Sequence, residues 1–130
     1  MKKLSIWVFL LLFAFLTLYS SCTTSEESTF SILGNWDVTM IYAETTVYSG
    51  GIITFAGSDT SGIVSVNFPP DTQIGSGPYT VSGNTVNFTI YWPDAEYTDT
   101  CTGTIANDNS MNGTLVENPG DTPGTWACTR

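Results

Sequence analysis

The chain has no histidine among its 130 residues and only three basic residues, Lys2, Lys3 and Arg130. Without histidine the usual general base at neutral pH is missing, which excludes Ser-His-Asp and Cys-His nucleophilic sites and the HExxH zinc motif. The shortage of Lys and Arg excludes nucleic acid as a partner, because phosphate backbones are bound through clustered basic side chains. We therefore predict no catalytic residues, no metal ligands and no cofactor.

Long hydrophobic runs are also scarce. The single example extends from Leu4 to Leu18, which is shorter than the roughly 20 residues that a membrane-spanning helix needs. It follows a lysine pair and precedes the small residues of a Ser-Ser-Cys sequence that ends at Cys22. This layout is typical of a secretory signal peptide. We assign residues 1–21 to the signal peptide and residues 22–30 to a polar tether.

A cysteine directly after small residues resembles the lipobox of bacterial lipoproteins, although Leu18 stands one position earlier than the leucine of that motif. The resemblance implies cleavage before Cys22, a diacylglycerol on its thiol, and an exported outer-membrane lipoprotein that faces the periplasm or the cell surface. Glu26 and Glu27 after the cysteine are read as part of a solvated tether or, alternatively, as a signal for surface export. With both lysines removed, the mature chain carries 12 acids against Arg130, so attachment to the membrane has to come from the lipid.

Helical periodicity is absent after Ser31, where Thr, Val, Ile and aromatic residues alternate with turn-forming Gly, Asn, Asp and Pro. Many short strands with tight turns predict an all-β domain over residues 31–130. We expect an eight-stranded up-and-down antiparallel barrel, with a β-sandwich as the alternative. The expected strands are Gly34–Tyr42, Gly51–Ala56, Gly62–Phe68, Tyr79–Ser82, Thr85–Trp92, Tyr97–Ile105, Met111–Val116 and Gly124–Arg130.

Period-two alternation identifies the inward face of two of these strands. Every second residue is apolar in Thr85–Trp92 and again in Gly34–Tyr42, and such alternation places one face against a core. If the barrel holds a ligand, these side chains are the candidates to line it. They are Trp36, Val38, Met40, Phe88, Ile90 and Trp92.

The sequence Gly34-Asn35-Trp36 and the final GTWACTR sequence resemble the two ends of a lipocalin-like (calycin-type) barrel, and the segments TVSGNTVNF and GTIANDNSMNGTL resemble small lipocalin-like lipoproteins. The resemblance implies that Gly34, Trp36 and Arg130 close the barrel, with the arginine packed across the tryptophan. A planar guanidinium stacks well on an indole ring. The alternative is an exposed Arg130 that pairs with a surface acid such as Asp37.

Two cysteines remain once Cys22 is lipidated. Export favours a disulfide bond between Cys101 and Cys128, with Gly113 in the intervening strand leaving room for the sulfurs. The spacing argues against it, because one strand between them separates the two cysteines by about 9 to 10 Å, which exceeds the reach of a disulfide. The alternative is a pair of buried thiols.

Two functions remain open. In the first, the barrel binds a small apolar or amphipathic molecule, and the candidates for an aromatic rim are Tyr48, Tyr91, Trp92 and Tyr97. In the second, the core is solid and the loops Pro69–Gly77 and Asn118–Gly124 contact a protein or glycan. A cavity of about 300 Å³ or more favours the first function. The acids Asp94, Glu96 and Asp99 are interpreted as turn and solubility residues rather than as a catalytic or calcium site.

Overall fold

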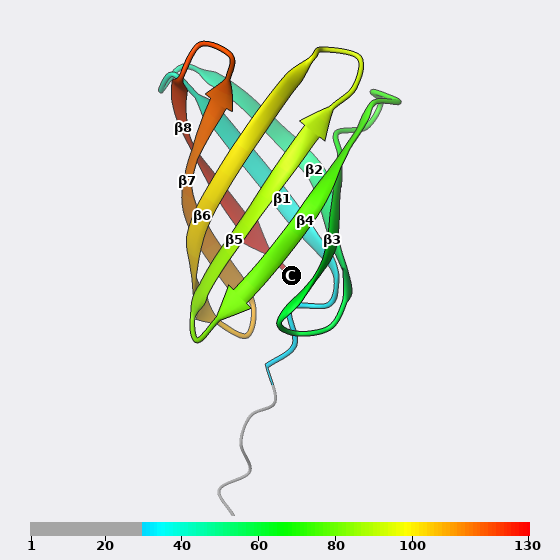
Figure 1. Ribbon diagram of the computed structural model, residues 1–130, viewed down its shortest axis with the longest axis vertical. Coiled ribbons are helices and arrows are strands. Elements are labelled where there is room, and N and C mark those ends of the chain that lie inside the picture. The colour runs from blue at the N-terminus through cyan, green and yellow to red at the C-terminus, as the bar shows by residue number, and fades with distance from the viewer. Residues whose placement is uncertain (1–29) are drawn as a thin grey trace, which may run out of the picture.

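The computed structural model describes residues 30–130, which form a closed barrel of eight antiparallel strands in sequence order (Figure 1). The last strand pairs with the first, Val38 lying opposite Cys128, so no strand edge is left open. The predicted up-and-down barrel is therefore confirmed, and the sandwich is excluded. The strands are β1 Gly34–Tyr42, β2 Thr46–Gly57, β3 Ser61–Asn67, β4 Ile74–Ser82, β5 Thr85–Trp92, β6 Tyr97–Asn107, β7 Ser110–Asn118 and β8 Thr122–Thr129.

The signal peptide, the lipidation site at Cys22 and most of the tether lie outside the described residues. Within residues 30–130 there is no helix with the length and apolar character needed to cross a membrane.

Two strands begin five residues earlier than the sequence predicts. β2 starts at Thr46 and β4 at Ile74, against predicted starts at Gly51 and Tyr79. For β4, the prediction interprets the glycines of the Pro69–Gly77 segment as part of a turn. In the barrel, Gly51 and Gly75 face inward and are buried. A Cβ at Gly51 would overlap the Phe68 ring, and one at Gly75 would overlap Ile90 and Trp92. These glycines therefore provide the space for large rings near one end of the barrel.

The interior of the barrel is filled by side chains at the end where Arg130 lies. Trp126, Phe88 and Phe55 form a chain of edge-on ring contacts, with centroids 5.0 Å and 5.9 Å apart, and Gly103 leaves room for the Trp126 indole. Each large apolar side chain that is fully buried stabilises the fold by about 1.5 to 3 kcal/mol. The buried apolar residues are Ile32, Trp36, Val38, Met40, Ile53, Phe55, Val64, Val66, Tyr79, Val86, Phe88, Ile90, Cys101, Ile105, Met111, Leu115, Trp126 and Cys128.

One end of the barrel, here called the closed end, is sealed by the segment before β1. Ile32 is fully buried there, and its carbonyl accepts a 2.8 Å hydrogen bond from Nε1 of Trp36. The Arg130 guanidinium lies 4.1 Å from the centroid of the Trp36 ring and donates to the carbonyls of Ser31 and Leu33 at 2.7 Å and 3.3 Å. Arg130 is thus fixed on the closing tryptophan, the position that the lipocalin resemblance implies.

The expected disulfide is not formed, and Cys101 and Cys128 are both buried free thiols. Both cysteines pair with residues of the intervening strand β7. Cys101 on β6 lies opposite Leu115, and Cys128 on β8 lies opposite Met111. These partners are four residues apart, which offsets the cysteines by roughly 13 Å along the strands in addition to their lateral separation. A disulfide needs Cα atoms within about 7 Å, so the register prevents the bond.

Candidate functional site

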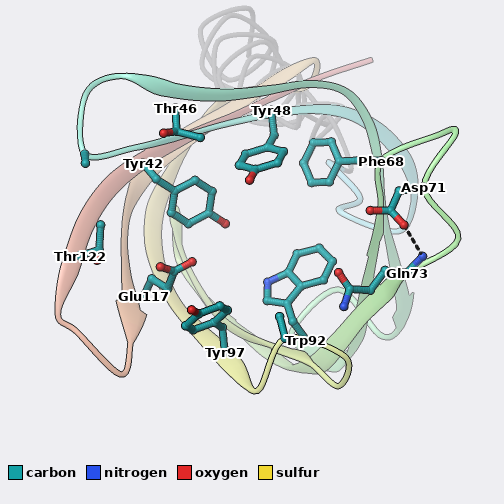
Figure 2. A pocket seen from close by; sticks show the side chains of 12 residues that line it. Tyr42, Thr46, Tyr48, Phe68, Asp71, Gln73, Trp92, Tyr97, Glu117 and Thr122 are labelled. Carbon is teal, nitrogen blue, oxygen red and sulfur yellow. Dashed lines mark hydrogen bonds between the residues drawn. The ribbon is translucent and has the colours of Figure 1, made fainter.

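The opposite end of the barrel, here called the mouth, contains a cavity of about 370 Å³ (Figure 2). The four hairpin loops β1–β2, β3–β4, β5–β6 and β7–β8 surround it. The cavity lies between the packed core and the mouth, so the barrel is filled towards the closed end and open at the mouth. Its lining residues are Tyr42, Ala43, Thr46, Tyr48, Phe68, Asp71, Gln73, Trp92, Ala95, Tyr97, Glu117 and Thr122.

Four aromatic rings form a continuous arc around the cavity (Figure 2). Tyr42 meets Tyr48 edge-on with ring centroids 5.6 Å apart, and Tyr48 lies 5.8 Å from Phe68. Phe68 in turn lies 6.4 Å from Trp92 at a tilt of 33°. Tyr97 lines the cavity next to Glu117 in Figure 2. The wall is therefore apolar and π-rich around much of its circumference, a surface suited to a flat or cationic group.

A buried carboxylate joins the two ends of this arc. Oδ2 of Asp99 accepts a 2.7 Å hydrogen bond from the Tyr42 hydroxyl and a 2.8 Å bond from Nε1 of Trp92. Asp99 is completely inaccessible to solvent, and its other oxygen, Oδ1, has no hydrogen-bond partner. The interpretation of Asp99 as a turn residue is therefore wrong: it lies within β6 and points inward, whereas Asp94 and Glu96 lie in the exposed loop before that strand.

A second carboxyl group lies beside Asp99. Glu117 on β7 is directly opposite Asp99 in the β6–β7 pairing and lines the cavity. Burial raises the pKa of Asp99, and the bonds from Tyr42 and Trp92 oppose that shift. Burial also raises the pKa of Glu117, and the neighbouring Asp99 adds to the increase. Burial, and secondarily the hydrogen bond to Asp99, raise the pKa of the Tyr42 phenol far above its usual value, so this group remains a neutral donor.

The charges of residues 30–130 are unevenly distributed along the barrel. Arg130, the only base in this range, lies at the closed end. The mouth carries acids both inside the cavity and on its loops, and no base of residues 30–130 neutralises them. These acids are Glu44, Asp71, Asp94, Glu96, Asp99, Glu117 and Asp121. The opening therefore presents a negative field, which attracts cations and repels anions.

Short polar contacts hold the loops around the cavity. In the β3–β4 loop, the Asn67 side chain donates to the carbonyl of Asp71 at 3.2 Å, and the backbone N–H of Gln73 donates to Oδ1 of Asp71 at 3.1 Å, the dashed line in Figure 2. The backbone N–H of Ala43 donates to the carbonyl of Pro123 at 2.9 Å, which ties the β1–β2 loop to β8. Both segments that were proposed as interaction surfaces contribute to the cavity wall, through Asp71 and Gln73 in one and Thr122 in the other.

The sequence prediction identified part of this site. Of the six residues proposed to line a ligand cavity, Trp92 does so, while Trp36, Val38, Met40, Phe88 and Ile90 are buried in the core beneath it. Of the four proposed rim aromatics, Tyr48, Trp92 and Tyr97 line the cavity. Tyr91 does not: its side chain is 55% exposed on a strand position that alternates with the buried face.

Tyr42, Phe68 and Glu117 were not proposed as ligand contacts, although the sequence contains a signal for each. Tyr42 continues the inward alternation of Val38 and Met40, and Phe68 continues that of Val64 and Val66. Glu117 follows inward Leu115 by two residues, in a part of β7 beyond the predicted strand end at Val116. Within residues 30–130, no three His, Cys, Asp or Glu side chains come together in a way that would hold a metal ion.

No protein-family model and no curated protein sequence matches the chain. Solved structures of redesigned β-barrels do resemble it. One aligns with a TM-score of 0.67 at 17% identity, over 75% of this chain and 90% of the other. A second, mFAP1 bound to DFHBI, has a TM-score of 0.64 at 16% identity over 75% and 94%. A third, mFAP0 bound to DFHBI, gives 0.63 at 17% over 75% and 97%. At these identities the similarity defines the fold class, a closed eight-stranded antiparallel β-barrel.

Proposed function

We propose that this protein is an exported, lipid-anchored barrel of lipocalin-like type that binds a small amphipathic molecule at its mouth without catalysing a reaction. The observation that carries the proposal is the cavity of about 370 Å³ that the aromatic arc and Glu117 line, next to the buried Asp99. Ligand sites are typically concave, mostly apolar and supplied with a few polar groups, with volumes of about 300 to 1,000 Å³. The mouth has each of these properties.

The fold comparison supports a site within a barrel of this size. The redesigned barrels mFAP1 and mFAP0 bind the small molecule DFHBI. Eight strands leave an interior that is either filled by side chains or holds one small ligand. In this chain the core is filled below and the mouth is open above, so the ligand belongs at the rim.

A lipid anchor at Cys22 would set the orientation of the barrel relative to the membrane. The described chain begins at Phe30, beside Arg130 at the closed end, and Cys22 precedes it by a short polar segment. A diacylglycerol on Cys22 would hold the closed end towards the membrane, since two acyl chains anchor a protein stably where a single one does not. The mouth would then face away from the lipid surface (Figure 1) and be accessible to dissolved molecules.

Native mass spectrometry of the full chain, extracted from the membranes of cells that express it, tests both parts of the proposal. Acylation adds the mass of the lipid to a chain that begins at Cys22, and a retained small molecule adds a further mass that is lost on activation. Thr46→Trp, which places an indole in the cavity, should abolish the retained mass. Val47→Trp is the matched control, because Val47 is 58% exposed on the outer face next to inward Thr46.

Retention by the control variant together with loss in the Thr46→Trp variant would support a ligand in the mouth. Equal retention by both variants would place the molecule elsewhere and overturn the proposed site. A chain without acylation would overturn the anchor. An empty cavity together with a co-purified protein or glycan would favour the alternative, in which the loops Pro69–Gly77 and Asn118–Gly124 form an interaction surface.

A further inference from the structure

We propose that the mouth cavity is selective for a small protonated amine, with the ammonium group beside Glu117, the cross-strand neighbour of the buried Asp99, and the apolar body of the ligand against the aromatic arc. This inference rests on the proposed function and specifies the chemical class of its ligand.

The first argument is an uncompensated pair of carboxyl groups. Asp99 and Glu117 are cross-strand neighbours on the inner face, and like charges in this arrangement destabilise a sheet. A buried carboxylate is costly unless a donor or an opposite charge compensates it. Asp99 receives two donors at one oxygen, while Oδ1 is buried without a partner. The only base in residues 30–130 is Arg130 at the closed end, so a compensating cation has to come from outside this part of the chain.

The second argument is the aromatic wall. Cations bind favourably over the faces of Trp, Tyr and Phe at up to about 6 Å from the ring centroid. Tyr42, Tyr48, Phe68 and Trp92 surround the same cavity that Glu117 lines. This combination of π faces and carboxylates matches an organic cation better than a metal ion, because no three-ligand metal cluster exists within residues 30–130.

The third argument is the poor fit of the other ligand classes. An anion would meet the negative field of the mouth acids, and the Tyr42 hydroxyl and Trp92 indole N–H already donate to Asp99. A neutral apolar molecule would cover the rings but leave the two carboxyl groups without a countercharge. A protonated amine provides both an apolar body and N–H donors with positive charge.

The test uses the full chain as extracted from the membrane, in uncharged dodecyl maltoside micelles, with its tryptophans labelled with ¹⁵N. Three probes of similar size differ in charge: 2-phenylethylammonium, 2-phenylethanol and phenylacetate. The indole N–H resonance of Trp92 reports occupancy directly, because this group lies in the wall and bonds to Asp99. The buried indoles of Trp36 and Trp126 serve as internal references for the fold.

We expect 2-phenylethylammonium to bind about tenfold more tightly than 2-phenylethanol, and phenylacetate to bind more weakly than either. Glu117→Gln should remove most of the preference for the amine while leaving the resonances of Trp36 and Trp126 in place. Asp94→Asn is the matched control: it removes one acidic charge from the mouth outside the cavity lining and should change the affinity less than twofold.

Two other outcomes have different meanings. If amine and alcohol both shift the Trp92 resonance with equal affinity, the charge selectivity is overturned and the binding function stands. If none of the probes shifts that resonance at millimolar concentration, while Trp36 and Trp126 report a folded barrel, both the amine selectivity and small-ligand binding at the mouth are contradicted.

Discussion

The hydroxyl of Tyr42 donates a 2.7 Å hydrogen bond to Oδ2 of Asp99, a residue 57 positions later in the sequence. Tyr42 ends β1 and Asp99 lies in β6, and these strands are not neighbours in the sheet. The bond therefore spans the interior of the barrel at the base of the cavity. It fixes the first ring of the aromatic arc relative to the carboxyl group that also binds Trp92.

Removing this hydroxyl should destabilise the barrel. Tyr42→Phe leaves the carboxylate of Asp99 with Trp92 as its only hydrogen-bond donor. Loss of a hydrogen bond to a buried charged group lowers the free energy of unfolding by about 1 to 3 kcal/mol. Urea denaturation should show a lower midpoint with an unchanged slope. Tyr48→Phe is the control, since Tyr48 is 49% exposed, and should change the free energy of unfolding by less than about 0.5 kcal/mol. Equal effects of the two substitutions would contradict a cross-barrel role for Tyr42.

The free energy of unfolding should depend on the ionisation of Asp99. Burial raises the pKa of Asp99 in the folded state, so between its unfolded and folded pKa values the folded chain binds more protons. Stability should therefore fall as pH rises from about 4 through the folded pKa. The titratable groups facing Asp99 are Tyr42, Glu117 and Cys101. The pKa of Glu117 is also raised, so its ionisation adds to the same decline in stability.

Denaturation curves at successive pH values test this dependence. Asp99→Asn should flatten the decline above pH 4, because the amide does not titrate, while the exposed Asp94→Asn should retain it. A decline of the same steepness in all three proteins would show that Asp99 is not its source.

Gly75 should be essential for the shape of the mouth. A Cβ at this position would overlap the side chains of Ile90 and Trp92, so Gly75→Ala should displace the indole and weaken its bond to Asp99. Overpacking of this kind typically costs about 1 to 3 kcal/mol. Ser76→Ala, on the neighbouring outward position, is the control. Thermal unfolding and the chemical shift of the Trp92 indole N–H should both change in the first variant, and an unchanged indole shift would contradict this account of Gly75.

The closure of the barrel by Arg130 should be specific to a guanidinium. Arg130→Lys retains the charge but loses the planar stack on Trp36 and the forked donation to Ser31 and Leu33. We expect a loss of about 0.5 to 1 kcal/mol for the exposed stacking contact. Arg130→Met should lose at least as much. Full stability of the lysine variant in urea denaturation would show that the stack contributes nothing.

The sequence was sufficient to predict the fold because period-two alternation and turn residues are local signals. The bounds of β1 and β5 agree with the prediction at both ends, and the closed barrel follows from short turns between consecutive strands. The start of β4 was missed because glycine has two uses: it forms turns, and it makes room for rings, as Gly75 does for Trp92.

The site was harder to predict because it depends on register. Asp99 near a Pro93-Asp94 turn has the local signature of a solvated acid, and only the barrel places it between Tyr42 and Trp92. Its position opposite Glu117 is likewise a property of the β6–β7 pairing. The cysteines show the same limit: export favoured a disulfide and the intervening strand argued against it, and only the register reveals the four-residue offset along β7 that separates them.

The most direct test of the account is a titration of the ¹⁵N-labelled full chain in which the Trp92 indole N–H signal is followed against 2-phenylethylammonium and, separately, 2-phenylethanol. A cavity lined by an aromatic arc and by Glu117, with the buried Asp99 as the cross-strand neighbour of Glu117, predicts saturable shifts of that signal, with the cation binding about tenfold more tightly. A Trp92 signal that stays fixed with both probes, in a chain whose Trp36 and Trp126 signals show an intact core, would contradict the account.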